Sequence, residues 1–459
     1  MKLSRCKSVI FRFFPGLSPV IIGGMASETG SRFLVIAYDR LGSKQAGPSI
    51  RTLALAGELA KVCEVEVIYE GESPVKINKG IKFTEKKSVV IDKSYLANFR
   101  GALGPPLFAM VCPEVFESDL PLAIDLFDPV VWENLELYRK EPLNERKFQH
   151  ERHLAALISS LLRGDYFLAA GKHQVDLYAG ALMVLNRINP GNYSTGIGSE
   201  QIIGFVPFGV PNDEPPNISR EKIPAEFHCE GVSIIWNGGM WEWLKPEMIV
   251  KAMPSVLVKY PNAKLFFPGT AHPNPHIPRM SVVGRVKELV KELGISKSVV
   301  FGDWLEREQY LALLSHSDVS VSAHARGLES QYAVRTRFSD SIWLGVPMVV
   351  SCGDEYSRLV REYELGEVIE DNDPEKFAGG IIKAVSTGKE AYKGGFEKAR
   401  KELSWENTAK PLREWAKNPV VTHGNGSEFF TETVGMPSHG KRPNDFRSLL
   451  KRLGDKMRR

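Results

Sequence analysis

Residues 322–350 read SAHARGLESQYAVRTRFSDSIWLGVPMVV, and this stretch decides the expected fold. It follows a short apolar run, residues 318–321, which is typical of a buried strand. Within the stretch we expect a helix over residues 331–344, followed by a Gly-Val-Pro turn. The apolar stripe of this helix consists of Val334, Phe338 and Ile342. The stretch therefore predicts a strand, a polar loop and a helix in succession.

The same alternation of short apolar runs and amphipathic segments continues on both sides of this stretch. Near the N-terminus, FLVIAYD from residue 33, PSIRTLALAGELAK from residue 48 and a strand at residues 64–69 predict a parallel sheet with right-handed crossovers. A second series begins with VSIIWNGG at residue 232. Residues 211–231 lie between the two series and are rich in proline and charge, which is typical of a linker.

We therefore expect an α/β protein with two Rossmann-like, doubly wound domains that face a cleft. Ligands of such sheets bind at the carboxyl ends of the strands, so the cleft is the expected site. The expected divisions are an N-terminal extension (1–30), a first, acceptor-side domain (31–215), a second, donor-side domain (216–418) and a basic tail (419–459).

The composition is that of a globular protein without a nucleic-acid partner. The 459 residues carry a formal net charge of +4, so the chain has no strong positive field overall. Its five cysteines are widely spaced, which predicts neither a disulfide framework nor a zinc site and favours a cytoplasmic location.

The two ends of the chain carry basic and apolar residues. Arg12 and Pro15 interrupt the apolar run of the first 24 residues, so we interpret this segment as an extension rather than a signal peptide, with Met25 as an alternative start. Residues 441–459 place apolar side chains on one helical face and basic ones mostly elsewhere. This pattern predicts peripheral membrane contact, and a partner-binding or disordered tail is the alternative.

Charged residues gather within the opening stretch. Arg335, Thr336 and Arg337 are expected in the first turns of its helix, where free backbone N–H groups and the helix dipole favour a diphosphate. Guanidinium groups there can donate paired hydrogen bonds. Asp340 is expected to accept ribose hydroxyls, and Glu329 sugar hydroxyls. The alternative is a surface ion-pair network among these charges.

The first domain offers its own candidates. Gly47 lies in a loop where the backbone can approach an oxyanion, and Arg51, one turn into the following helix, is expected to reach the same anion. Asp125 and Asp128 end a strand and are expected to bind acceptor or sugar hydroxyls, or alternatively to cap the next helix. No dinucleotide or P-loop glycine motif occurs in the sequence.

The segment DSIWLGVP, from Asp340 to Pro347, resembles a motif of GT-B glycosyltransferases, especially family four. In that motif two acidic residues flank a loop, and the second begins a helix that ends in Gly-x-Pro. Asp340 takes the place of the second acid, whereas the usual count of eight back reaches Tyr332, so Glu329 matches the first acid only with a longer loop. WNGGMWEWLKPEMI from residue 236, FFPGTAHPNP from 266 and VPFGVPNDEPP from 206 resemble a bacterial subgroup of the family, and the resemblance spans about residues 32–417.

The resemblance implies further donor-binding residues. In the family, the glycine equivalent to Gly239 is followed by an arginine and, five positions later, by a lysine, and both reach the donor diphosphate. Here Met240 replaces the arginine, while Lys245 keeps the place of the lysine. Trp304 lies where the family has a residue near the nucleobase, and His324 is placed in the same donor site.

The resemblance implies a retaining, metal-independent glycosyltransferase. It would move a sugar from a nucleotide diphosphate sugar to a hydroxyl of a saccharide or lipid-linked acceptor. The nucleotide diphosphate sugar would be its co-substrate, and no other cofactor is expected. The reaction would belong to the synthesis of cell-surface polysaccharide or glycolipid. The implied catalytic residues are Lys245, Arg335, Arg337 and Glu329. Two alternatives remain, a sugar-nucleotide 2-epimerase and a catalytically silent sugar-nucleotide-binding subunit.

Overall fold

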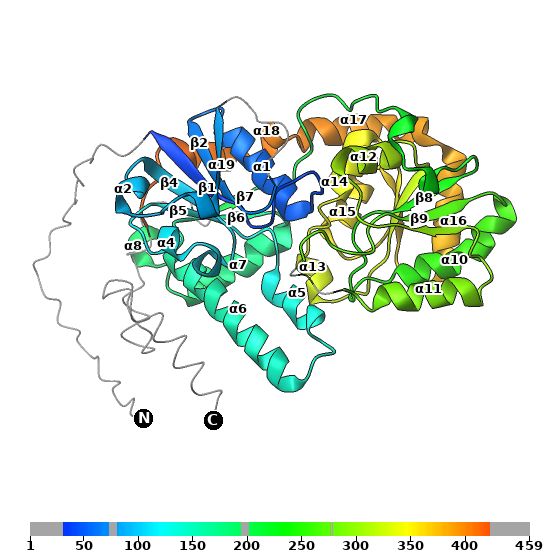
Figure 1. Cartoon of the computed structure of the whole chain (residues 1–459), viewed down its shortest axis with the longest axis horizontal. Coiled ribbons are helices and arrows are strands. Elements are labelled where there is room, and N and C mark those ends of the chain that lie inside the picture. The colour runs from blue at the N-terminus through cyan, green and yellow to red at the C-terminus, as the bar shows by residue number, and fades with distance from the viewer. Residues whose placement is uncertain (1–30, 73–79, 194–201, 276, 278, 423–459) are drawn as a thin grey trace, which may run out of the picture.

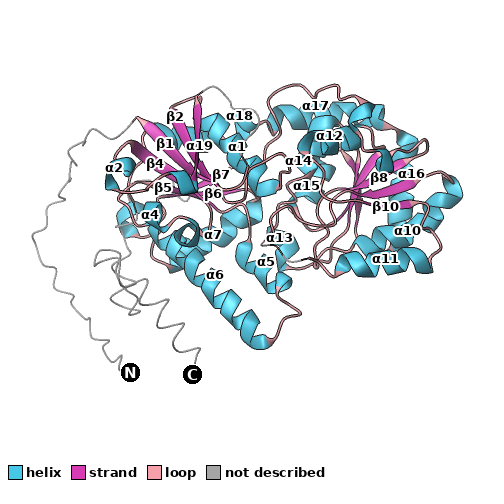
Figure 2. Cartoon of the chain, in the orientation of Figure 1, coloured by secondary structure: helices cyan, strands magenta, loops and turns pink. Residues whose placement is uncertain are grey.

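The computed structural model describes residues 31–72, 80–193, 202–275, 277 and 279–422, which form two lobes side by side (Figure 1). Each lobe contains a parallel sheet flanked by helices (Figure 2), so the expected α/β fold class is confirmed. The amphipathic pattern of residues 441–459 and the extension at residues 1–30 lie outside the described residues.

The first lobe is built on a seven-stranded sheet with the order β3-β2-β1-β4-β5-β6-β7. Its strands are β1 (Arg32–Ile36), β2 (Glu64–Tyr69), β3 (Ile81–Glu85), β4 (Phe99–Gly104), β5 (Leu122–Asp125), β6 (Tyr166–Ala169) and β7 (Ile203–Phe205). Its helices are α1 (Gly47–Leu59), α2 (Lys93–Leu96), α3 (Phe108–Val111), α4 (Pro113–Phe116), α5 (Val130–Leu137), α6 (Leu143–Arg163), α7 (Lys172–Val184) and α8 (Pro190–Tyr193).

The second lobe is built on a six-stranded sheet with the order β10-β9-β8-β11-β12-β13. Its strands are β8 (Ser233–Trp236), β9 (Lys264–Phe267), β10 (Val299–Phe301), β11 (Val319–Ser322), β12 (Met348–Ser351) and β13 (Gly366–Ile369). The helices that follow β8 in the chain are α10 (Pro246–Lys259), α11 (Val282–Glu292), α12 (Arg307–Ser315), α13 (Leu328–Tyr332), α14 (Phe338–Leu344), α15 (Glu355–Tyr363), α16 (Pro374–Thr387), α17 (Lys393–Glu402), α18 (Trp405–Thr408) and α19 (Lys410–Lys417).

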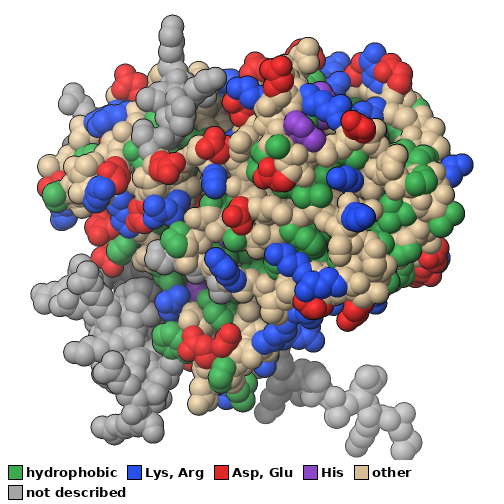
Figure 3. Space-filling view, turned by 45° about the vertical axis from the view of Figure 1, so that its right-hand side comes forward, with side chains coloured by type: hydrophobic (Ala, Val, Ile, Leu, Met, Phe, Trp, Pro, Cys, Tyr) green, Lys and Arg blue, Asp and Glu red, His purple; other side chains and the backbone are tan. Residues whose placement is uncertain are grey.

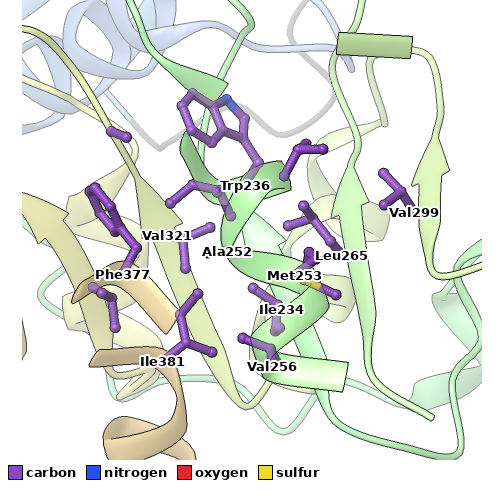
Figure 4. Packing of buried hydrophobic residues seen from close by; sticks show 14 of the residues in the cluster. Ile234, Trp236, Ala252, Met253, Val256, Leu265, Val299, Val321, Phe377 and Ile381 are labelled. Atoms are coloured by element: carbon purple, nitrogen blue, oxygen red, sulfur yellow. The ribbon is translucent and has the colours of Figure 1, made fainter. Parts of the chain in front are cut away.

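The sequences of the strands are short apolar runs because helices cover both faces of each parallel sheet. In the second lobe, Trp236 on β8 and Leu265 on β9 pack against Met253 on α10 (Figure 4). Phe377 and Ile381 on α16 belong to the same buried cluster. This core fixes the carboxyl ends of β8 and β11, from which site residues extend.

The opening stretch does not form one helix over residues 331–344. α13 ends at Tyr332, Ala333 has an extended backbone, and α14 begins only at Phe338. The break places Val334 against hydrophobic clusters of both lobes. Phe338 remains in the second-lobe core, as the apolar spacing predicts. The helix prediction is therefore wrong between Ala333 and Arg337, because packing against the first lobe outweighs local periodicity.

The C-terminal helices return to the first lobe. After α17, the backbone of Trp405 bonds to Val210, and α18 and α19 pack on α1 (Figure 1). Leu412 and Ala416 are buried in a first-lobe cluster. The expected assignment of residues 216–418 to the second domain is therefore wrong at its C-terminal end, because an amphipathic sequence does not specify which lobe it covers.

The surface mixes both signs of charge. Lys and Arg side chains alternate with Asp and Glu over the face shown in Figure 3, in line with the small net charge. Among the described residues, no helix combines the length and the apolar character that a bilayer crossing needs.

Candidate active site

A cavity of about 310 Å³ lies between the two lobes. The first lobe lines it with the segments that follow β1 and β5 and with the start of α1. The second lobe lines it with the segments after β8, β9, β10 and β11 and with the break before α14. The carboxyl ends of both sheets thus meet at one cavity, where parallel sheets bind ligands.

Arg337 lines this cavity with a buried side chain that has an unsatisfied hydrogen-bond donor. Its guanidinium stacks on Trp304, with 3.9 Å from Cζ to the ring centroid, and lies 5.0 Å from the ring centroid of Tyr310. Although only 9% of Arg337 is exposed, its Nη2 has no hydrogen-bond partner among the described residues. Burial lowers the pKa of Arg337 from its ordinary value. A buried donor without an acceptor marks a place where an anionic ligand can complete the hydrogen bonding.

Arg335 also lines the cavity, but both of its Nη groups are already paired. Its Nη1 and Nη2 donate to the carboxylate of Glu329 at 2.7 and 2.9 Å. Burial raises the pKa of Glu329, but the charge and hydrogen bonds of Arg335 outweigh burial and hold it below the ordinary value. Glu329 therefore orients Arg335, and it does not line the cavity that it was predicted to reach.

The two lobes touch beside this arginine pair. A Cβ atom added to Gly47 would lie 2.1 Å from Oγ1 of Thr336, so only glycine permits this approach. Nε1 of Trp304 donates to the carbonyl of Gln45 at 3.2 Å. Gly47, Thr336 and Trp304, three predicted donor-binding residues, therefore form the contact between the lobes and line the cavity.

The first-lobe side of the cavity carries two coupled carboxyl groups. Asp128 follows β5, and Glu133 lies in the first turn of α5. Burial, and then the charges of Asp125 and Glu329, raise the pKa of Asp128 to about 6. Burial and the charge of Asp128 raise the pKa of Glu133 well above its ordinary value. Each of the two groups therefore holds its proton to a higher pH than an isolated carboxyl does.

Replacing Asp128 with asparagine is expected to stabilise the chain at pH 7 by on the order of 1 kcal/mol. The pKa of Asp128 in the folded chain, about 6, lies above its ordinary value of 3.8. The folded state therefore holds more protons in this window, and the wild type loses stability as the pH rises through it. Urea unfolding at pH 7 and near pH 4 measures the difference. The gain should shrink towards pH 4, and a variant less stable than the wild type at pH 7 would show that the sign is wrong.

Arg51 and Asp125 do not reach the cavity. Nε and Nη2 of Arg51 donate to the Asp125 carboxylate at 2.7 and 2.9 Å, and Nη2 and Nη1 also bond to the carbonyls of Val206 and Pro207. Arg51 is fully buried. The structure does not place Arg51 or Asp125 where the predicted phosphate or acceptor would lie, because each fills the other's hydrogen-bonding capacity and neither lines the cavity.

Asp340 is likewise occupied within the second lobe. Both of its carboxylate oxygens accept hydrogen bonds from Arg307 at 2.6 Å, and 2% of the residue is exposed. It does not line the cavity. The prediction that Asp340 binds ribose hydroxyls is not supported, since Arg307, which local sequence did not indicate as a partner, takes both oxygens.

The remaining predicted residues divide between the cavity and its surroundings. Gly239 lines the cavity. Lys245 precedes α10, is exposed and does not line it. His324 is buried behind the wall, with Nδ1 3.9 Å from Asp354. Its backbone N–H donates to Ser351, and its carbonyl accepts from Asn372. Neither Lys245 nor His324 therefore lines the cavity in which a ligand is expected.

Several cavity residues were not identified from the sequence. Glu133 stands five residues after Asp128 in the first turn of a helix, and that spacing could have indicated the pair. His272 packs edge-on against Trp304 with 4.9 Å between ring centroids, and burial lowers its pKa to about 4. Asn237 donates to Ser341 at 2.8 Å and gives no local signal. Their roles depend on contacts between segments far apart in the chain.

The two facing Rossmann-like lobes define the GT-B fold, and comparison with solved structures agrees. Sucrose-phosphate synthase from Thermosynechococcus elongatus superimposes with a TM-score of 0.56 at 13% identity, over 84% of this chain and 98% of that one. Anabaena HepE in complex with UDP and glucose gives 0.55 at 12% identity, with the same coverages. WaaG, a glycosyltransferase involved in lipopolysaccharide biosynthesis, gives 0.52 at 13% identity, over 85% and 99%.

The sequence comparisons are more specific for the second lobe. Residues 242–401 match the family model described as glycosyl transferases group 1. D-inositol 3-phosphate glycosyltransferase from Acidothermus cellulolyticus is 22% identical over 220 residues, which is 46% of this chain and 46% of that protein. The aligned part thus spans about half the length of this curated relative. The chain has the GT-B fold and contains a region that matches group 1 glycosyl transferases. The family resemblance inferred from the sequence is therefore confirmed.

Proposed function

We propose that the chain transfers a sugar from a nucleotide diphosphate sugar to a hydroxyl acceptor, with retention of configuration. The unpartnered Nη2 of buried Arg337 in the interlobe cavity is the observation that carries the proposal. The group 1 match of residues 242–401 supports it. HepE, a protein with the same fold, has been solved in complex with UDP and glucose.

The chemistry needs positive charge where the diphosphate departs. As the bond from the sugar anomeric carbon to the diphosphate oxygen breaks, negative charge grows on the leaving group, and fixed cations and N–H donors stabilise it. Arg337 has a free donor for this charge, and Arg335, held by Glu329, adds a second cation. The acceptor oxygen bonds to the anomeric carbon on the same face, and its proton passes to an oxygen of the departing diphosphate.

Contact between the lobes limits hydrolysis. The closeness of Gly47 to Thr336 and the hydrogen bond from Trp304 to Gln45 close the cavity beside the arginines. Closer approach of the lobes over a bound donor would exclude water and favour transfer of the sugar over its hydrolysis. The donor base, the sugar and a role in cell-surface polysaccharide or glycolipid synthesis remain predictions from the sequence.

A nucleotide screen tests this function on the full chain. Millimolar UDP, GDP, ADP, dTDP and CMP are added separately, and the melting temperature is followed. We expect one nucleoside diphosphate to raise it most, because binding to the folded state alone stabilises that state. The matching sugar nucleotide is then incubated with acceptor glycosides, and proton NMR of the product reads the anomeric configuration. No shift with any nucleotide would contradict the proposal, whereas an epimerised donor would indicate the epimerase alternative and binding without transfer the silent subunit.

Replacing Gly47 with alanine is expected to lower turnover about tenfold or more, because even small misplacement of catalytic groups is costly. The new Cβ would overlap Thr336 and hold the lobes apart. The control is Gly180→Ala, since a Cβ there meets no atom within 4 Å. Steady-state kinetics of both variants should show the loss only for Gly47→Ala, and equal turnover in the two would remove lobe contact from the mechanism.

A further inference from the structure

The charges that line the interlobe cavity are divided between its two walls. The carboxylates of Asp39, Asp128 and Glu133 all belong to the first lobe. The guanidinium groups of Arg335 and Arg337 both belong to the second lobe. No lysine or arginine of the first lobe is among the described residues that line the cavity. The cavity therefore has one acidic and one cationic wall.

The free donor of Arg337 and the pairing of Arg51 indicate which substrate lies against each wall of the cavity. Arg337 lines the cavity, and its buried Nη2 has no hydrogen-bond partner within the described part of the chain. A diphosphate supplies acceptors to the arginines on this wall, whereas Asp128 on the opposite wall, whose pKa is about 6, is ionised at neutral pH and repels it. The buried guanidinium of Arg51 on the first lobe is paired with Asp125 and does not line the cavity, so it is not available to an anion there. The space beside the carboxyl pair is therefore left for the second substrate.

The carboxyl pair is suited to one kind of group. Asp128, Glu133 and Tyr38 all line the cavity from the first lobe, where burial and then the charge of Asp128 raise the pKa of Glu133 and of Tyr38. Carboxylate oxygens accept hydrogen bonds from sugar hydroxyls and from ammonium groups. A phosphate or carboxylate offers acceptors only, so it would face oxygens across the gap.

We propose that the acceptor presents a neutral polyhydroxyl or amino-bearing group to Asp128 and Glu133, with no phosphate or carboxylate beside its reacting hydroxyl. This inference rests on the proposed function and adds the chemical class of the acceptor. The acceptor proposed here therefore differs from a phosphorylated compound such as D-inositol 3-phosphate, which appears in the name of the curated relative. Asp128 and Glu133 are then residues that determine acceptor specificity.

The test measures the binding of three matched probes to the full chain saturated with the nucleoside diphosphate found in the screen. Methyl α-D-glucopyranoside, D-glucosamine and D-glucose 6-phosphate are titrated, and saturation-transfer NMR follows their signals. We expect the phosphate probe to bind about tenfold or more weakly than the other two, and the difference to shrink in high salt.

Variants locate the source of this discrimination. In Asp128→Asn/Glu133→Gln the disadvantage of D-glucose 6-phosphate should fall by about fivefold or more. The matched control is Glu136→Gln on the same helix, because Glu136 lies outside the cavity, and it should keep the wild-type ratio. The melting temperature of each variant confirms folding.

Each outcome supports or overturns the inference. Equal or tighter binding of the phosphate probe to the wild type would overturn it. An unchanged ratio in the double variant, or no binding of either non-anionic probe, would do the same. Failure of every nucleotide to bind would instead refute the proposed function, and that result is read separately in the nucleotide screen.

Discussion

Replacing Asp125 with alanine is expected to lower the free energy of unfolding by about 3–5 kcal/mol. The carboxylate accepts two hydrogen bonds from Arg51, which is fully buried, and the variant would leave this guanidinium charge uncompensated. The pair joins α1 to β5, so the loss affects the core that supports the first-lobe wall of the cavity.

Chemical unfolding of the purified chain measures this loss. Asp119→Ala, at an exposed position in the same lobe, is the control and should change stability by less than about 0.5 kcal/mol. The double variant Arg51→Met/Asp125→Leu should recover most of the stability, since removing both charges leaves no buried ion unpaired. A loss for Asp125→Ala no larger than for the control would show that the pair does not hold the lobe together.

Replacing Arg337 with alanine is expected to weaken nucleoside diphosphate binding by about 1.5–3 kcal/mol, or roughly 10- to 150-fold. The variant removes a cavity-lining guanidinium whose buried Nη2 has no acceptor among the described residues, and it also removes the stacking partner of Trp304. Hydrogen bonds between a guanidinium and a phosphate are among the stronger ones because both partners are charged.

Isothermal titration with the preferred nucleoside diphosphate measures the effect. The control is Arg326→Ala, since Arg326 lies in the same segment but is exposed and pairs with Glu370 at 3.3 Å. Arg326→Ala should bind the nucleotide as the wild type does. Unchanged affinity in Arg337→Ala would remove Arg337 from the binding site, whatever the activity of the variant.

Most of the fold could be predicted from local sequence. Buried parallel strands such as β8 and β11 are short apolar runs, and α10 and α11 show helical spacing, so their order predicts two βα lobes. The return of α18 and α19 to the first lobe could not be predicted in this way. Their apolar faces fit either lobe, and only the packing of Trp405 and Leu412 decides the choice.

The site could be predicted where a position depends on local chain geometry. Gly47, Asp128, Gly239 and Trp304 follow strands at the carboxyl ends of the sheets, and all four line the cavity. Such positions are given by the βα pattern itself. Their roles in binding remain proposals that the variants above address.

The site could not be predicted where a charge has a distant partner. Asp125 lies 74 residues from Arg51, and Asp340 lies 33 residues from Arg307. The sequence shows these charges as free candidates for a ligand, whereas folding pairs them. Arg337 shows the reverse case. Its charged neighbours in sequence suggest that it is paired in an ion-pair network, whereas its buried Nη2 has no partner in the described structure.

A crystal structure of the chain with its preferred nucleoside diphosphate tests the central claim most directly. We predict the diphosphate in the interlobe cavity, with an oxygen within hydrogen-bond distance of Nη2 of Arg337 and the nucleotide on the second-lobe side. A diphosphate bound outside this cavity, with Nη2 of Arg337 still unbonded, would contradict the account.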